Sequence, residues 1–162
     1  MSSEGGSLVK ADSMKRGALL PDEGHVIRHV PLAKTRRDSR GKILGILPTA
    51  IERRDGEDYL SVSFLEHFLG DENQKLRQVK QAIAAAKQSG TLGAQSVLAK
   101  ANIGDLRSVV QQRAARKIRI AYQPTSKDPA HSAIYEIPQE DAELMGELAD
   151  EVFSHTTPVN SI

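Results

Sequence analysis

The sequence predicts an α+β fold in which a single antiparallel or mixed sheet is covered by helices. Two observations favour this class. Short segments rich in β-branched residues occur in both halves of the chain, and amphipathic segments with a helical period lie between them and after them. Strands at both ends with helices between them are typical of α+β proteins rather than of alternating α/β folds. The chain has 162 residues, which fits one domain with a sizeable core.

Five segments are predicted to be strands. Each is short, rich in β-branched or alternating apolar residues, and bounded by residues that end strands. Pro31 and Pro48 end the first two, and the turn at Asp55-Gly56 precedes the third. The five segments are residues 25–30, 43–47, 59–63, 117–122 and 132–137.

Two amphipathic helices are predicted over residues 72–88 and 139–153. In each, apolar residues recur three and four positions apart, and the second helix is acidic on its other faces. Residues 94–101 are expected to add a helical turn or two, and Asp105 is expected to cap a further helix. Two capping boxes are predicted, each with an acceptor side chain three residues before Glu or Gln. The apolar stripe of the first helix is Leu76, Val79, Ile83 and Ala86, and that of the second is Met145, Leu148, Ala149 and Val152. The two predicted capping boxes are Ser63 with Glu66 and Asp71 with Gln74.

Composition divides the chain into a folded part and two tails. Residues 1–24 are rich in Ser, Gly and charge and show no apolar period, so a flexible tail is expected there. A single α+β domain is expected over residues 25–155, followed by a C-terminal tail over residues 156–162. No repeat or coiled-coil heptad is visible.

Several function classes are disfavoured by composition. The chain has no cysteine, which excludes disulfides, thiol catalysis and cysteine-based zinc sites. No apolar run approaches the ~18 residues of a membrane span, and the first 24 residues lack a secretory signal, so a soluble cytoplasmic protein is expected. The common phosphate-binding glycine loops are absent, as are the serine hydrolase elbow and the H-E-x-x-H zinc motif, and no cofactor is expected.

Charge is distributed unevenly along the chain. Residues 1–54 carry eleven Lys and Arg against six Asp and Glu, whereas residues 136–162 carry seven acidic residues and no Lys or Arg. Two explanations stay open. The ends can face each other in the folded protein, or the basic part can bind an acidic partner.

Arg28 and His29 are candidate catalytic residues in the first predicted strand. Val26, Arg28 and Val30 share one face of this strand, and His25, Ile27 and His29 share the other. Whichever face is buried, a polar side chain goes inward with apolar neighbours. A buried arginine is costly unless it pairs with a carboxylate or an anionic ligand. Glu66 and Glu136 are the carboxylates considered for such a pair.

Ser61 and His131 complete the candidate catalytic set. Ser61 points away from Leu60 and Val62 on its strand, and His131 lies where a loop meets a strand. Histidine titrates near neutral pH, which suits general acid–base catalysis. The alternative for both is an ordinary surface position.

A metal site at His25 and His29 is not expected. Four residues of strand span ~13 Å at ~3.3 Å each, whereas zinc binds each ligand at ~2.0–2.1 Å. The two imidazoles therefore cannot reach one ion from a regular strand. His25 is kept as a candidate ligand-binding residue.

The basic loop at residues 34–42 is a candidate binding site for phosphates. It contains five basic residues and one acidic residue. The forked guanidinium groups of its arginines suit phosphate oxygens, although a solvated loop is the simpler explanation. The binding candidates in this loop are Arg36, Arg37, Arg40 and Lys42.

Three short segments resemble landmarks of a group of small bacterial proteins with no established activity. These are an R-H-V segment at residues 28–30, an L-S-V strand at residues 60–62 and an H-A-x-[IV] strand that begins at His131. The likeness covers roughly residues 25–153, with Ser132 where alanine is usual. It implies a bacterial protein of an accessory or mobile-element locus and supplies no catalytic residues.

Three hypotheses for the function follow. The first is a non-enzymatic binding or accessory protein of a bacterial assembly, with a protein as its partner and no membrane contact. The second is an enzyme for a phosphate-bearing or nucleotide substrate, in which Arg28 holds the anion, His29 and His131 act as acid and base, and Ser61 orients the substrate. The third is a nucleic-acid-binding module that uses residues 34–42. The second requires His29 and His131 to lie within roughly a nanometre of each other across one pocket.

Overall fold

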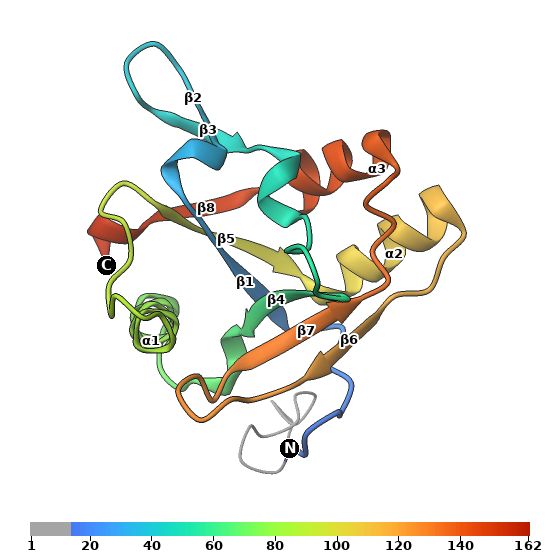
Figure 1. The fold of residues 1–162 in the computed structure, drawn as a ribbon, viewed down its shortest axis with the longest axis horizontal. Helices are drawn as coiled ribbons and strands as arrows, with labels where there is room; N and C mark the ends of the chain where they lie inside the picture. The colour runs from blue at the N-terminus through green and yellow to red at the C-terminus, as the bar shows by residue number, and fades with distance from the viewer. Residues whose placement is uncertain (1–13) are drawn as a thin grey trace.

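A six-stranded antiparallel sheet forms the centre of the molecule (Figure 1). The computed structural model describes residues 14–162. The strands lie side by side in the order β6-β7-β4-β1-β5-β8, so the two halves of the chain are interleaved. Their bounds are β1 His25–Val30, β4 Tyr59–Phe64, β5 Val97–Asn102, β6 Arg119–Tyr122, β7 His131–Tyr135 and β8 His155–Pro158. The predicted α+β class is confirmed.

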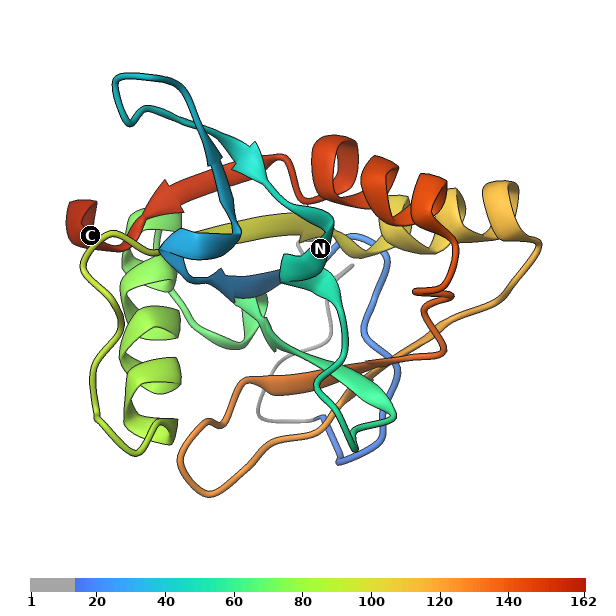
Figure 2. The ribbon, with the colours of Figure 1, turned by 45° about the horizontal axis from the view of Figure 1, so that its top comes forward.

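In the described part of the chain, three α-helices cover the sheet on its two faces. Helix α1 (Glu72–Ala86) lies on one face, and helices α2 (Ile103–Ala114) and α3 (Ala142–Glu147) lie together on the other (Figure 2). Helix α3 continues as a π-helical segment, Leu148–Val152. Among the described residues, no helix is long and apolar enough to cross a membrane.

Both faces of the sheet are buried, which explains why strand β1 is apolar on both sides. Val26 and Val30 face the larger core, which contains α2 and α3, whereas Ile27 faces the smaller core under α1. The predicted apolar stripes of the first and last helices lie in these two cores. The smaller core contains Leu76, Val79 and Ile83 of α1. The larger core contains Met145, Leu148, Ala149 and Val152.

One predicted capping box is confirmed and the other is wrong. The carboxylate of Asp71 accepts from the backbone N–H of Gln74, and the Gln74 side chain accepts from the backbone of Asp71, so this box begins α1. Ser63 lies inside β4 instead of capping a helix, and Glu66 accepts from His25. Helix α2 is capped by Asn102 rather than by Asp105, whose backbone N–H donates to the Asn102 side chain.

Residues 94–101 do not form the expected helix. Most of this segment belongs to β5, which pairs with β1 along its whole length. The Ala-rich sequence has a high helix propensity, but burial between β1 and β8 decides its conformation. Tertiary contacts therefore override a local preference.

The basic segment at residues 34–42 is part of a hairpin that projects from the body (Figure 1). Strands β2 (Thr35–Arg37) and β3 (Ile43–Ile46) pair antiparallel with an irregularity between Arg36 and Arg37. The loop between them contains Gly41 at a φ of 82°, a backbone conformation that favours glycine.

Both ends of the predicted domain extend further than composition indicated. The expected N-terminal tail covers residues 1–24; its first thirteen residues lie outside the described part. Residues 17–20 run along β6, where the backbone N–H of Leu20 donates to the carbonyl of Ile120. Residues 155–158, at the start of the expected C-terminal tail, form β8 and pair with β5. Each of these two segments lies against a strand that is far away in the sequence, so composition along the chain does not indicate it.

Candidate functional site

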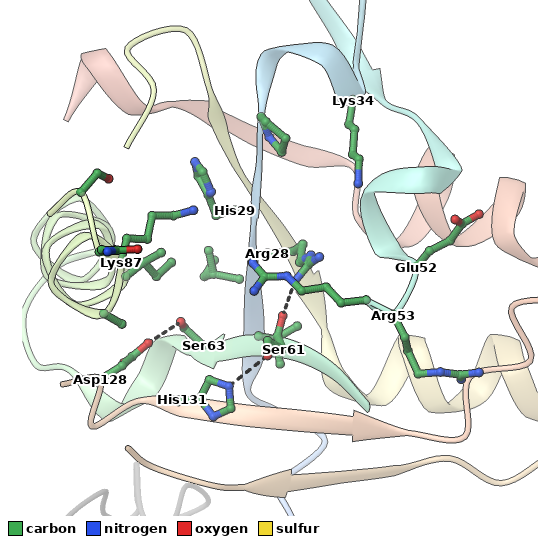
Figure 3. Close-up of a pocket in the computed structure, with 18 of the residues that line it drawn as sticks. Arg28, His29, Lys34, Glu52, Arg53, Ser61, Ser63, Lys87, Asp128 and His131 are labelled. Atoms are coloured by element: carbon green, nitrogen blue, oxygen red, sulfur yellow. Dashed lines mark hydrogen bonds between the residues drawn. The ribbon is translucent and has the colours of Figure 1, made fainter. Parts of the chain in front are cut away.

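A pocket opens where strands β1 and β4 separate (Figure 3). The two strands pair only at Val26 with Phe64 and at Ile27 with Ser63, although β1 continues to pair with β5. The pocket has a volume of about 960 Å³. Its walls come from β1, β4, the C-terminal end of α1, the 3₁₀ turn at Pro48–Ile51 with the residues after it, and the start of β7. Arg28, His29, Ser61 and His131, the four candidate catalytic residues, all line it.

Arg28 is held in the gap between the strands by backbone groups. Its Nε donates to the carbonyl of Ala50 at 2.9 Å and its Nη1 donates to the carbonyl of Ser61 at 2.8 Å. Within residues 14–162 it forms no ion pair, and its other guanidinium N–H groups have no hydrogen-bond partner. Burial, together with the nearby charge of Arg54, lowers the pKa of Arg28 to about 10. Arg28 is therefore still a cation at neutral pH, and among the residues described it has no carboxylate partner of the kind expected for a purely structural arginine.

Ser61 and His131 form a hydrogen-bonded pair in the wall of the pocket. His131 Nε2 lies 3.1 Å from Ser61 Oγ, and His131 Nδ1 lies 2.7 Å from the carbonyl oxygen of Gln123. A carbonyl oxygen can only accept, so a neutral His131 carries its proton on Nδ1 and the lone pair of Nε2 accepts from the Ser61 hydroxyl. The edge of the Tyr59 ring packs against the imidazole, with ring centroids 6.2 Å apart. A hydroxyl, a base and a third group that orients the base are the parts of an activated nucleophile.

His29 lies on the side of the pocket nearest α1. Its Nε2 atom is buried and has no hydrogen-bond partner within the described residues. Burial lowers the pKa of His29 to about 4, and the positive charges of Lys87 and Arg28 act in the same direction. The imidazole is therefore neutral at pH 7. In this neutral form His29 is a hydrogen-bonding group of the pocket, and its role as a general acid stays a prediction.

A buried carboxyl group also borders the pocket. Asp128 is only 4% exposed; one of its oxygens accepts from the backbone N–H of Ala130 at 3.0 Å. The other lies 3.5 Å from Ser63 Oγ, which is long for a hydrogen bond. Burial raises the pKa of Asp128, against the opposing effect of the Ala130 N–H group. The negative charge of this acid is thus disfavoured in the pocket.

Basic side chains outnumber acidic ones around the pocket. They come from four separate parts of the chain, which makes the pocket a site of positive potential. The basic residues are Arg28, Lys34, Arg53, Arg54 and Lys87, and the acidic residues are Glu52 and Asp128.

The other predicted binding residues lie elsewhere. The Nδ1 and backbone N–H of His25 each lie 2.7 Å from the carboxylate of Glu66, so this histidine is bound within the protein. Arg36 pairs with Asp150 at 3.1 Å, and Arg37 donates to the carbonyls of Gly41 and Gln95.

Arg40 and Lys42 are exposed on the hairpin, away from the pocket. Lys42 borders a separate, smaller cavity of about 420 Å³. No group of three or more His, Cys, Asp or Glu side chains that could hold a metal ion occurs in the part of the chain the structure describes. The hairpin and the pocket are thus two distinct features of the surface.

Sequence reasoning missed four of the residues that shape the pocket. Arg53, Arg54, Lys87 and Asp128 lie in loops or at the end of a helix, where charge is ordinary. Two features of the sequence could have indicated these residues. Arg53 and Arg54 are adjacent arginines just before the Asp55-Gly56 turn, and Asp128 lies three residues before His131. Their convergence depends on the interleaved order of the strands.

Comparison of the chain with family models, with curated proteins and with solved structures returned no match. The resemblance of the three short segments to small bacterial proteins stays an expectation. The geometry of the pocket is therefore the basis for proposing a function.

Proposed function

We propose that the protein is a hydrolase of phosphate-bearing small molecules, with Ser61 as the nucleophile, His131 as the base and Arg28 as the group that holds the phosphate. The observation that carries the proposal is the Ser61–His131 hydrogen bond, oriented by the carbonyl of Gln123. It lies in one pocket with the half-buried cation Arg28, which pairs with no carboxylate among residues 14–162. Each of the three groups has an ordinary structural role on its own. Their convergence in one pocket has no such explanation.

The reaction follows from the protons that each group can carry. The Ser61 oxygen attacks phosphorus and forms an O–P bond, while its proton passes to His131 Nε2. The bond from phosphorus to the leaving oxygen breaks, and His131 returns the proton to that oxygen. Water then attacks the phosphoserine and gives one proton to His131, the P–O bond to Ser61 breaks, and the serine oxygen regains a proton. The net change is hydrolysis of the ester to an alcohol and phosphate.

Charge favours a phosphate over a neutral ester as the substrate. Arg28 is a cation beside Ser61, and Lys34, Arg54 and Lys87 border the same pocket without an ion pair in the described residues. Arginine can contact two oxygens of one phosphate group at once, which holds the phosphate and offsets charge that develops in the transition state. A neutral ester would leave these charges uncompensated.

The test is hydrolysis by the full chain of p-nitrophenyl phosphate, bis-p-nitrophenyl phosphate and inorganic pyrophosphate, with orthophosphate binding measured by calorimetry. We expect turnover of at least one compound and a loss of roughly 100-fold or more in Ser61→Ala and in His131→Ala, because each removes half of the nucleophile–base pair. Ser126→Ala is the matched control, since Ser126 is exposed and outside the pocket. Absence of turnover with orthophosphate bound would overturn the catalytic role, and absence of orthophosphate binding would overturn the whole proposal.

Binding of a protein partner by the β2–β3 hairpin is a second candidate. Leu44 on this hairpin is 55% exposed, and the side chains of Arg40 and Lys42 have no hydrogen-bond partner within residues 14–162. An apolar group beside two free cations suits an acidic partner. This role predicts that Leu44→Ser combined with Arg40→Ser abolishes partner binding and leaves phosphate binding unchanged. Binding of nucleic acid by the hairpin would instead weaken steeply as salt rises.

A further inference from the structure

The pocket contains a second group of polar side chains that the Ser61–His131 pair does not use. His29 and Lys87 lie together on the side nearest α1, and Figure 3 shows the Lys87 side chain directed toward the imidazole. The His29 imidazole has no hydrogen-bond partner within residues 14–162, and its Nε2 atom is buried, so a ligand in the pocket can reach the ring nitrogens only at Nδ1. Within the described residues, Lys87 forms no ion pair.

The position of these two residues separates them from the phosphate held beside Ser61. Consecutive residues of a strand point to opposite faces, so the side chains of Arg28 and His29 leave β1 in different directions. Arg28 reaches the carbonyl of Ser61, whereas His29 turns toward α1 (Figure 3). An anion bound by His29 and Lys87 therefore occupies a different part of the pocket from an anion bound by Arg28.

We propose that His29 and Lys87 form a second anion subsite, so that the substrate of this pocket carries two phosphate groups, as a diphosphate or a bisphosphate. This inference rests on the proposed function, because the first phosphate is the one beside Ser61 and Arg28. The second phosphate accepts from a neutral His29 through an Nδ1–H group and is paired with the Lys87 ammonium. The charge of the Lys87 ammonium is then compensated by an anion.

Size and charge agree with a substrate of this kind. A pocket of about 960 Å³ is in the upper part of the range of ~300–1,000 Å³ typical of small-molecule sites, so it holds more than one phosphate group. The lining has five basic residues against two acidic ones, and burial disfavours the charged form of one of these acids, Asp128. A phosphomonoester would leave several positive charges unbalanced, whereas two phosphate groups come closer to neutralising them.

Calorimetry on the full chain tests the second subsite with three probes. Orthophosphate reports a single anion, methylenediphosphonate reports two adjacent anions without being hydrolysed, and fructose 1,6-bisphosphate reports two anions set apart. We expect one of the two probes with two phosphoryl groups to bind at least about tenfold more tightly than orthophosphate, a difference of about 1.4 kcal/mol. Which probe shows the preference distinguishes a diphosphate from a bisphosphate.

Substitution of the subsite residues supplies the decisive comparison. Lys87→Met and His29→Leu are each expected to bring the affinity ratio of the preferred probe to orthophosphate down by about tenfold, toward one. Arg77→Met is the matched control, because Arg77 is an exposed cation on the same helix outside this pocket, and it should leave the ratio within about twofold. A melting curve establishes that each variant is folded.

Two results would overturn the second subsite. One is a wild-type affinity ratio near one with both probes that carry two phosphoryl groups, and the other is a ratio that Lys87→Met does not change. In either case orthophosphate binding and Ser61-dependent hydrolysis can persist, and the proposed hydrolase then stands with a monoester substrate. Loss of those two properties in the wild-type chain would instead contradict the proposed function itself.

Discussion

His29 and Arg28 are adjacent in the sequence, but partial burial affects the charge of their side chains differently. Arg28 keeps its charge at neutral pH and places it against two backbone carbonyls. His29 is neutral at that pH, and its buried Nε2 has no hydrogen-bond partner within the described residues. The sequence indicated that a polar side chain would go inward here, and it suggested a carboxylate as the partner of Arg28. The carbonyls of Ala50 and Ser61 take that place because β1 and β4 diverge at this point.

The stability of the protein is expected to fall in acid, in part because of His29. Burial holds the folded-state pKa at about 4, below the ordinary value of 6.5, so the unfolded chain binds the proton more readily between these pH values. Stability from this residue is present above pH 6.5 and is lost as the pH falls toward 4. We expect a contribution on the order of 1 kcal/mol after screening by solvent. Urea unfolding at pH 4.5 and pH 7 measures the difference.

Substitution of His29 isolates this contribution. His29→Gln does not titrate, so the variant should lose less stability than the wild type between pH 7 and 4.5. Part of the dependence of the unfolding free energy on pH will persist, since burial also lowers the pKa of His67. His155→Gln on an exposed position of β8 is the control and should follow the wild type. If His29→Gln lost as much unfolding free energy as the wild type between pH 7 and 4.5, His29 would not be buried as a neutral group.

At the scale of single elements, helix α1 connects the fold to the pocket. The Asp71 capping box fixes its first turn, and its apolar stripe seats it on the smaller core. Its C-terminal end then brings Lys87, Gln88 and Ser89 to the pocket wall. A local sequence signal, the capping box, thus helps to set the position of residues that have no signal of their own.

The cap at Asp71 is expected to stabilise the protein measurably. Asp71→Ala removes the acceptor for the Gln74 N–H group and should lower the free energy of unfolding by about 1 kcal/mol. Asp71→Asn retains an amide oxygen that can accept, so its change should be a few tenths of that value. Thermal or urea unfolding of the two variants measures the difference. Equal losses would mean that the charge of Asp71, rather than its hydrogen bond, matters.

On the scale of the whole molecule, segments distant in sequence lie at the two edges of the sheet. Residues 17–20 run along β6 at one edge, and β8 forms the other edge against β5. The charge asymmetry of the chain is partly resolved within the fold, where Arg36 of the basic part pairs with Asp150 of the acidic part.

Residues 14–20 are expected to be part of the cooperative fold. Leu20 is 1% exposed and belongs to the larger core, whereas the adjacent Leu19 is 62% exposed. Leu20→Ala should therefore cost about 2–5 kcal/mol of unfolding free energy, and Leu19→Ala should stay within about 0.5 kcal/mol. Chemical denaturation of the pair gives the comparison. Similar small effects at both positions would show that this segment contributes little to the core.

The sequence by itself determined the features that depend on neighbours along the chain. These are the α+β class, the apolar stripes of α1 and of the last helix, the Asp71 cap, and the choice of Arg28, His29, Ser61 and His131 as unusual residues. Helical period, strand alternation and capping act over a few residues, so they can be read locally.

Only the tertiary structure decided the features that depend on strand pairing. Residues 97–102 became β5 instead of a helix, β8 and the segment before β1 completed the edges, and the divergence of β1 from β4 opened the pocket. His131 meets Ser61 because β7 pairs with β4 across a separation of 70 residues. Hydrogen bonds between strands join residues without regard to their distance in sequence, so no local pattern could place the Ser61–His131 pair beside Arg28.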